Sequence, residues 1–92
     1  MLDKIKCEKL DHSRKITQEA FQIAKKSITP GKEKEAKEIL KMVDCYLEDS
    51  KHFEKKEDFV NSFGSIYYAH GWLDAGARLK IFIVTDSNLF TI

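Results

Sequence analysis

The sequence predicts an all-α protein: an antiparallel three-helix bundle with a short extended C-terminal tail. Three segments repeat apolar residues with the 3.6-residue period of an amphipathic helix. The connections between them are short, which favours antiparallel neighbours. The 92 residues are enough for one domain. We expect its helices at about 2–28, 31–54 and 58–80, and the tail at 81–92.

The first predicted helix, residues 2–28, has one apolar arc and one polar arc. The apolar arc consists of Leu2, Ile5, Ile16, Ala20, Ile23, Ala24 and Ile28. The clearest break in the chain follows, at Ser27-Ile28-Thr29-Pro30-Gly31. In this break Thr29 is the expected N-cap of the next helix, with Pro30 at its first position.

The second predicted helix, residues 31–54, repeats the pattern. Its apolar face consists of Ala36, Ile39, Leu40, Val43, Tyr46, Leu47, Ser50 and Phe53. A short connection, Lys55-Lys56-Glu57-Asp58, leads to the third helix. Asp58 is the expected N-cap there, because a carboxylate accepts hydrogen bonds from the first free amides of a helix.

The third predicted helix, residues 58–80, is apolar on more than one face. One seam, at alternating spacings of four and three residues, consists of Phe59, Phe63, Ile66, His70, Leu73 and Ala77. The opposite side carries small and aromatic residues: Gly64, Tyr68, Gly71, Trp72, Ala75 and Leu79. Apolar surfaces of this kind are normally covered, here by the tail, by the long first helix or by a second copy of the chain. The predicted core consists of Ile16, Ala20, Ile23, Ile39, Val43, Leu47, Phe59, Phe63, Ile66 and Leu73.

The composition argues against several classes of partner. Sixteen basic and fifteen acidic residues give a net charge of +1, so no charge excess attracts nucleic acid or anionic lipid. No apolar run is long enough to span a membrane. Cys7 and Cys45 form no close pair. We therefore expect a cytoplasmic protein with reduced thiols that uses no cofactor and no metal.

A polar strip on the third helix is the candidate binding site. Tyr67, His70, Asp74 and Arg78 lie within about one quadrant of that helix. Asp74 can orient His70 as a general base, and Arg78 can hold an anion. The structural alternative is an Asp74–Arg78 ion pair and a seam histidine bonded to a neighbour. We favour this alternative, because no nucleophile, glycine-rich loop or second carboxylate accompanies the strip.

Part of the chain resembles a known family. Residues 68–79 read YAHGWLDAGARL, and the upstream segments YLED at 46–49 and DFVN at 58–61 also fit. These motifs resemble the small archaeal family named domain of unknown function 357. The resemblance implies an archaeal source, a helical-bundle fold and no known activity. Such sequences often have a glycine in the connection between the second and third helices, where this chain has Glu57. The second helix must therefore end in another way.

These observations favour a non-enzymatic helical interaction or assembly module. Its partner would be a second copy docked through the third helix, or another protein. The alternative is a small-molecule or anion-binding site around His70, Asp74 and Arg78. Enzymatic activity stays open, with the non-enzymatic role favoured.

Overall fold

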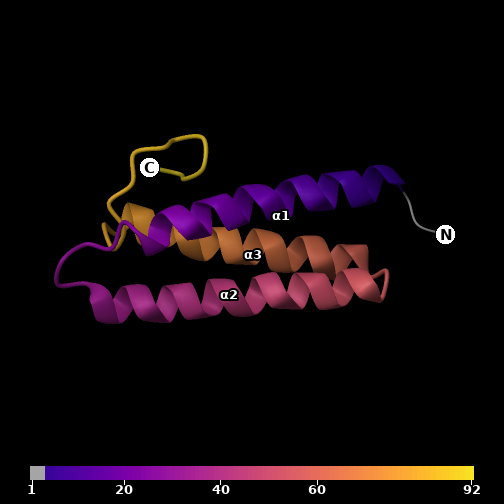
Figure 1. Cartoon of the computed structure of the whole chain (residues 1–92), viewed down its shortest axis with the longest axis horizontal. Helices are drawn as coiled ribbons and strands as arrows, with labels where there is room; N and C mark the ends of the chain where they lie inside the picture. The colour runs from indigo at the N-terminus through magenta and orange to yellow at the C-terminus, as the bar shows by residue number, and fades with distance from the viewer. Residues whose placement is uncertain (1–3) are drawn as a thin grey trace.

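Three helices in up-down-up order form an elongated bundle. The computed structural model describes residues 4–92, apart from the side chain of Ile5. The helices are α1 (Lys4–Lys25), α2 (Glu33–Lys55) and α3 (Phe59–Arg78). Consecutive helices run antiparallel, and the tail folds back beside the C-terminal end of α1 (Figure 1). The bundle measures 49 × 23 × 16 Å. Position 2 of the predicted first helix and the side chain of Ile5 lie outside the described residues.

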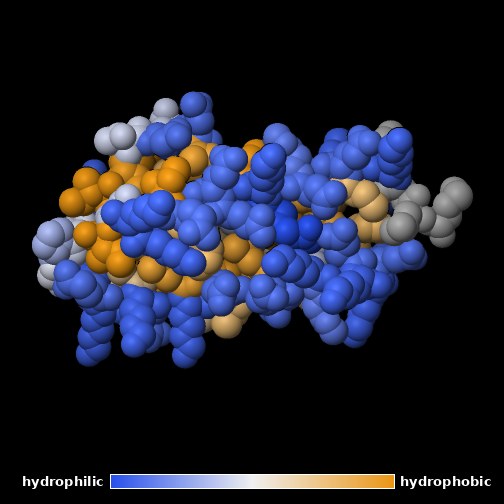
Figure 2. All heavy atoms as spheres, viewed as in Figure 1, coloured by the Kyte–Doolittle hydropathy of each residue, from blue (hydrophilic) through white to orange (hydrophobic). Residues whose placement is uncertain are grey.

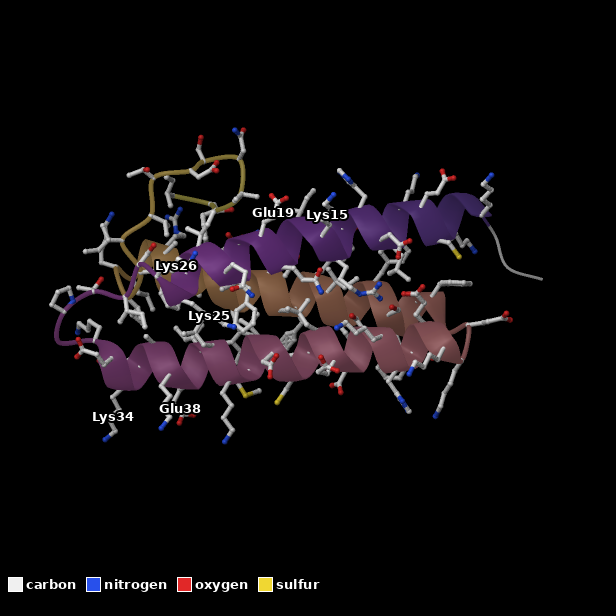
Figure 3. The ribbon with its side chains drawn as sticks, in the orientation of Figure 1. Lys15, Glu19, Lys25, Lys26, Lys34 and Glu38 are labelled. Atoms are coloured by element: carbon white, nitrogen blue, oxygen red, sulfur yellow. The ribbon has the colours of Figure 1, made fainter. Side chains whose placement is uncertain are left out.

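The third helix is the centre of the packing. It packs most extensively against α2 and less against α1, and α1 and α2 contact each other least. Charged side chains such as Lys34 and Glu38 point away from the bundle (Figure 3). Hydrophobic atoms gather between α1 and α2 towards the end where the tail lies (Figure 2). The amphipathic pattern thus orients α1 and α2 with their charged arcs outward.

The predicted core is buried only in part. Ala20, Ile39, Val43, Leu47, Ile66 and Leu73 are buried, whereas Ile16, Ile23, Phe59 and Phe63 are half-buried. Leu10 and Phe21 are buried instead on α1. Small residues on the inner faces, Ala24, Ala36, Ala69 and Ala77, complete the helical core. The buried arc of α1 therefore lies to one side of the predicted arc.

The first connection differs from the prediction. The first helix ends at Lys25, short of residue 28, and Ile28 forms an antiparallel bridge with Phe82 of the tail. The predicted N-cap, Thr29, is wrong, because the residue that precedes α2 is Lys32. The amide of Thr29 instead donates to the carbonyl of Ile81 at 3.0 Å. The prediction failed because the backbone of this break pairs with the tail rather than starting a helix.

The ends of α2 and α3 follow one backbone motif. Glu57 (φ 59°) and Lys80 (φ 61°) each adopt the left-handed conformation just beyond a helix. After α2, the amide of Asp58 donates to the carbonyl of Phe53 at 2.9 Å, which is the Schellman pattern. Glu57 ends α2 without a glycine, by accepting this strained conformation. The predicted N-cap of α3 is confirmed, since the Asp58 side chain accepts from the amide of Asn61.

Two aromatic residues fasten the tail to the bundle. Phe82 is 1% exposed and Phe90 is 2% exposed, and both belong to the main core cluster. Phe82 packs where α3 has Gly76, so closely that a Cβ there would lie 2.5 Å from its ring. The tail therefore takes part in the core, which the sequence did not predict.

A buried polar cluster joins the three helices near the opposite end of the bundle. Arg14 of α1 pairs with Glu54 of α2 at 2.7 Å. Its Nε also donates to the hydroxyl of Ser50 at 3.2 Å. The backbone carbonyl of Ser50 in turn accepts from the hydroxyl of Ser62 on α3 at 2.6 Å. Because Arg14 is only 9% exposed, its buried charge needs the ion pair with Glu54.

Candidate functional site

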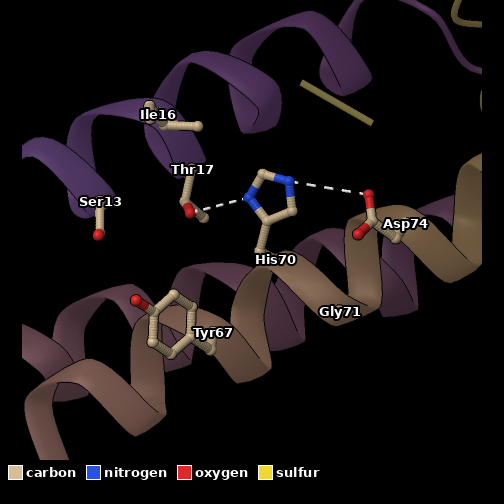
Figure 4. Close-up of a pocket in the computed structure, with 7 residues that line it drawn as sticks. All are labelled: Ser13, Ile16, Thr17, Tyr67, His70, Gly71 and Asp74. Atoms are coloured by element: carbon tan, nitrogen blue, oxygen red, sulfur yellow. Dashed lines mark hydrogen bonds and ion pairs between the residues drawn. The ribbon is translucent and has the colours of Figure 1, made fainter. Parts of the chain in front are cut away.

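His70 lies at the centre of the predicted polar strip, where α3 faces α1 and the tail. Its Nδ1 lies 2.9 Å from the hydroxyl oxygen of Thr17 on α1 (Figure 4). Its Nε2 lies 2.7 Å from the carbonyl oxygen of Leu89 in the tail. The seam histidine is thus satisfied by neighbours from two other segments of the chain.

These partners fix the tautomer of a neutral His70 ring. A carbonyl oxygen only accepts, so the hydrogen must sit on Nε2 and point at Leu89. Nδ1 then accepts from the hydroxyl of Thr17. Thr17, His70 and the tail therefore form one chain of hydrogen bonds between three segments.

Asp74, one turn after His70, holds the end of the tail. Its two carboxylate oxygens accept from the amide of Thr91 at 2.9 Å and from the hydroxyl of Thr91 at 3.2 Å. One oxygen also lies 3.7 Å from Nε2 of His70. No ion pair between Asp74 and Arg78 occurs in the part of the chain that the structure describes. Arg78 is exposed instead.

A cavity of about 350 Å³ lies between α1 and α3 beside this cluster. Its walls consist of Ser13, Ile16, Thr17, Tyr67, His70, Gly71 and Asp74 (Figure 4). Three of the four predicted site residues, Tyr67, His70 and Asp74, therefore meet at one cavity. Arg78 does not line it. The formally charged residue at the cavity is Asp74, a carboxylate that repels anions.

Thr17, His70 and Asp74 stand in the order of a nucleophile, a base and a carboxylate. A reactive hydroxyl must be reachable by its substrate, and Thr17 is only 2% exposed. Nε2 of His70 is also closer to Leu89, at 2.7 Å, than to Asp74, at 3.7 Å. This geometry holds the tail in place and leaves the Thr17 hydroxyl too buried to act as the nucleophile of such a triad. Among residues 4–92, no group of three or more His, Cys, Asp or Glu side chains is placed to hold a metal ion.

Sequence reasoning missed the partners of the strip. Thr17 falls three residues before Ala20 on the buried arc of α1, and a polar residue in that position was the available signal. Leu89 and Thr91 gave no signal, because the tail has no helical period and its bonds reach back 17 to 19 residues.

The outer face of α3, the exposed side of this helix, is the second candidate, and it borders the cavity at Tyr67 and Gly71. It consists of Val60, Gly64, Tyr67, Tyr68, Gly71, Ala75 and Leu79, all of them exposed. A Cβ added at Gly64 or Gly71 would meet nothing within 4 Å. Tyr68 rests against Tyr46 of α2, with ring centroids 4.6 Å apart. Trp72, which the sequence also predicted here, is half-buried beside Tyr68.

The tail does not cover this outer face. Its contacts are with the flank of α3 that carries His70 and Asp74. Of the covers that the sequence left open, the tail therefore occupies a different surface, and Tyr67 and Tyr68 remain 63% and 51% exposed.

Comparisons with known proteins identify a family and name no activity. No curated protein and no solved structure matches the chain. None of the described helices is long and apolar enough to cross a membrane. One family model matches residues 12–82, a stretch that includes all of α2 and α3 and ends just after the tail begins. By this match the chain belongs to the family described as protein of unknown function (DUF357).

Proposed function

We propose that this protein is a non-enzymatic assembly module that docks a second copy of itself on the outer face of α3. The observation that carries the proposal is a long exposed helix face without charge. Residues 59–73 contain no Asp, Glu, Lys or Arg, yet Val60 is 82% exposed and Tyr67 63% exposed. Depletion of charge together with exposed aromatic rings is typical of the centre of a protein interface.

The chemistry of the rest of the chain favours a copy of α3 as the occupant. An uncharged face is best covered by another uncharged face, because burying an unpaired charge against it is costly. The outward arcs of α1 and α2 carry lysines and glutamates, such as Lys15 and Glu38 (Figure 3). On the described surface, the uncharged face of α3 is therefore best matched by the same face of a second copy. Pairing of identical faces about a two-fold axis is the common form of homodimer.

The glycines explain how two such helices would approach. Glycine in a helix interior costs about 0.5–1 kcal/mol relative to alanine. The packing of Phe82 explains Gly76, because the Phe82 ring fills the space that a side chain at residue 76 would need. Gly64 and Gly71 have no such neighbour within the described chain. Close approach of another helix backbone would explain why glycine occupies both positions.

Sedimentation of the intact chain and of Gly71→Leu tests the proposal. We expect a concentration-dependent dimer for the intact chain and a monomer for Gly71→Leu, whose side chain blocks close approach. Because the space beside Gly71 is open, the variant keeps its helical circular dichroism. Cys45→Leu, which adds the same side chain on an exposed site of α2, is the matched control and stays dimeric. A monomer at every concentration of the intact chain contradicts the proposal.

The cavity between α1 and α3 supports a second candidate, the binding of a small molecule. Its volume of about 350 Å³ lies within the usual range for ligand sites. Asp74 at its wall favours a neutral or cationic ligand over the predicted anion. A fragment screen that follows the NMR signals of His70 and Tyr67 tests this candidate. If no fragment shifts these signals, the cavity is not a ligand site.

A further inference from the structure

We propose that the two copies pair antiparallel, about a two-fold axis level with the midpoint between Tyr67 and Tyr68 of α3. This inference rests on the proposed function and adds the orientation and the register of the partner. It follows from where small, large and charged residues stand along one helix face.

The small residues are placed symmetrically about this midpoint. Gly64 precedes it and Gly71 follows it by the same number of residues, about 5 Å along the helix on either side. An antiparallel copy therefore brings Gly64 level with the partner's Gly71. Val60 comes level with the partner's Ala75 in the same way. Both close-approach positions are thus used twice, once on each side of the axis.

The aromatic residues then meet at the centre. Tyr67 and Tyr68 flank the axis and are 63% and 51% exposed. Tyr68 is already braced by Tyr46 of α2, so little side-chain freedom remains to be lost when it is covered. Large aromatic residues at the centre of an interface, with small residues around them, are a common arrangement of binding energy.

The charges at the ends of the face favour this orientation over a parallel one. A parallel pair would set Arg78 beside the partner's Arg78, and Asp74 beside the partner's Asp74. In the antiparallel pair the two Arg78 residues lie about 32 Å apart along the axis, well beyond the screening length of about 8–10 Å. The same register brings the exposed Arg78 level with the partner's exposed Glu57. The dipoles of the two antiparallel helices also point in opposite directions, so that the positive end of each lies near the negative end of the other.

Disulfide trapping tests the register. Two variants, Gly64→Cys and Gly71→Cys, are made in a chain carrying Cys7→Ser and Cys45→Ser, and one of them bears an affinity tag. Helices packed about 8–10 Å apart bring facing backbones within disulfide reach. After mixing and mild oxidation we expect a mixed disulfide between the two variants. Each variant alone remains unlinked, because its two cysteines lie about 10 Å apart along the axis.

The outcomes distinguish a failure of this inference from a failure of the proposed function. Disulfides formed by each variant alone show a parallel pair and overturn the register, while self-association through α3 stands. A dimer by sedimentation in which neither mixture nor single variant is linked overturns the register, and the sedimentation of Gly71→Leu then decides whether α3 is the interface. A monomeric Cys7→Ser, Cys45→Ser chain at every concentration overturns both the register and the proposed function. Circular dichroism of each variant controls for folding.

Discussion

The Nε2 atom of His70 lies 2.7 Å from the carbonyl oxygen of Leu89. This bond ties the tail to the flank of α3, and it leaves the outer face of that helix open. The polar strip and the uncharged face are therefore used differently, although both belong to one helix. His70 and Asp74 of the strip bind a segment of their own chain, whereas the outer face, which includes Tyr67, has no cover among the described residues.

The carboxylate of Asp74 should hold the end of the tail. Replacing it by alanine removes both hydrogen bonds to Thr91, and we expect a loss of about 1 kcal/mol in the free energy of unfolding. Amide hydrogen exchange measured by NMR should become faster at Thr91 and remain slow in the middle of α3. Asp74→Asn keeps one acceptor oxygen and should lose less. An unchanged exchange rate of the Thr91 amide in Asp74→Ala contradicts this role.

Two glycines of α3 should respond in opposite directions to the same substitution. Gly76→Ala places a methyl group 2.5 Å from the ring of Phe82, so we expect destabilisation by about 1–3 kcal/mol from overpacking. Gly71→Ala meets open space and should stabilise the monomer by about 0.5–1 kcal/mol through helix propensity. Urea denaturation at a concentration low enough to keep the chain monomeric measures both. Equal effects at the two sites would contradict the packing of Phe82.

The helices were predictable because their apolar residues recur with the helical period. The arc of α1 that is buried was less so: Ile16 and Ile23 are half-buried, whereas Leu10 and Phe21 are buried. The reason is that α1 packs mainly against α3 and hardly against α2. The neighbouring helix decides which edge of the wide apolar arc of α1 is buried. The apolar period of α1 alone carries no information about that neighbour.

The sequence predicted the α3 residues of the candidate site but not their partners. The spacing of His70 and Asp74 placed them on one side of α3, as they are. Their partners were not predictable, because Thr17 lies 53 residues from His70 in sequence and the tail has no periodic pattern. Arg78, one turn beyond Asp74, lies outside the wall of the cavity, so the structure does not bring this predicted anion-holding group together with His70 and Asp74 there.

Replacing either of the two non-glycine residues in left-handed conformation by glycine should stabilise the protein. Glu57 (φ 59°) and Lys80 (φ 61°) both follow a helix, where glycine has no steric penalty. We expect Glu57→Gly and Lys80→Gly each to raise the free energy of unfolding by about 0.5–1 kcal/mol. Glu38→Gly, inside α2, is the control and should lower it by about 1 kcal/mol. A loss of stability in both turn variants would show that the left-handed turns are not the source of strain.

The packing of Tyr46 against Tyr68 should appear as a dependence of stability on alkaline pH. Burial raises the pKa of Tyr46 above its ordinary value of 10.0, and the adjacent Tyr68 raises this pKa further. The folded chain therefore keeps a proton that the unfolded chain releases. The contribution of this tyrosine is complete below pH 10.0 and is lost as the pH rises through the folded pKa.

Substitution isolates the contribution of Tyr46 to the alkaline pH dependence of stability. In Tyr46→Phe, the free energy of unfolding should fall less steeply above the ordinary tyrosine pKa than in the intact chain, because phenylalanine has no proton to lose. In Tyr68→Phe, tyrosinate absorbance should show the pKa of Tyr46 moving back towards 10.0, because Tyr68 is one cause of the rise. Tyr67→Phe, which alters the exposed tyrosine next to it in sequence, is the matched control and should leave the pKa of Tyr46 unchanged. Equal alkaline slopes in the intact chain and in Tyr46→Phe would mean that the 4.6 Å ring contact between Tyr46 and Tyr68 does not control this titration.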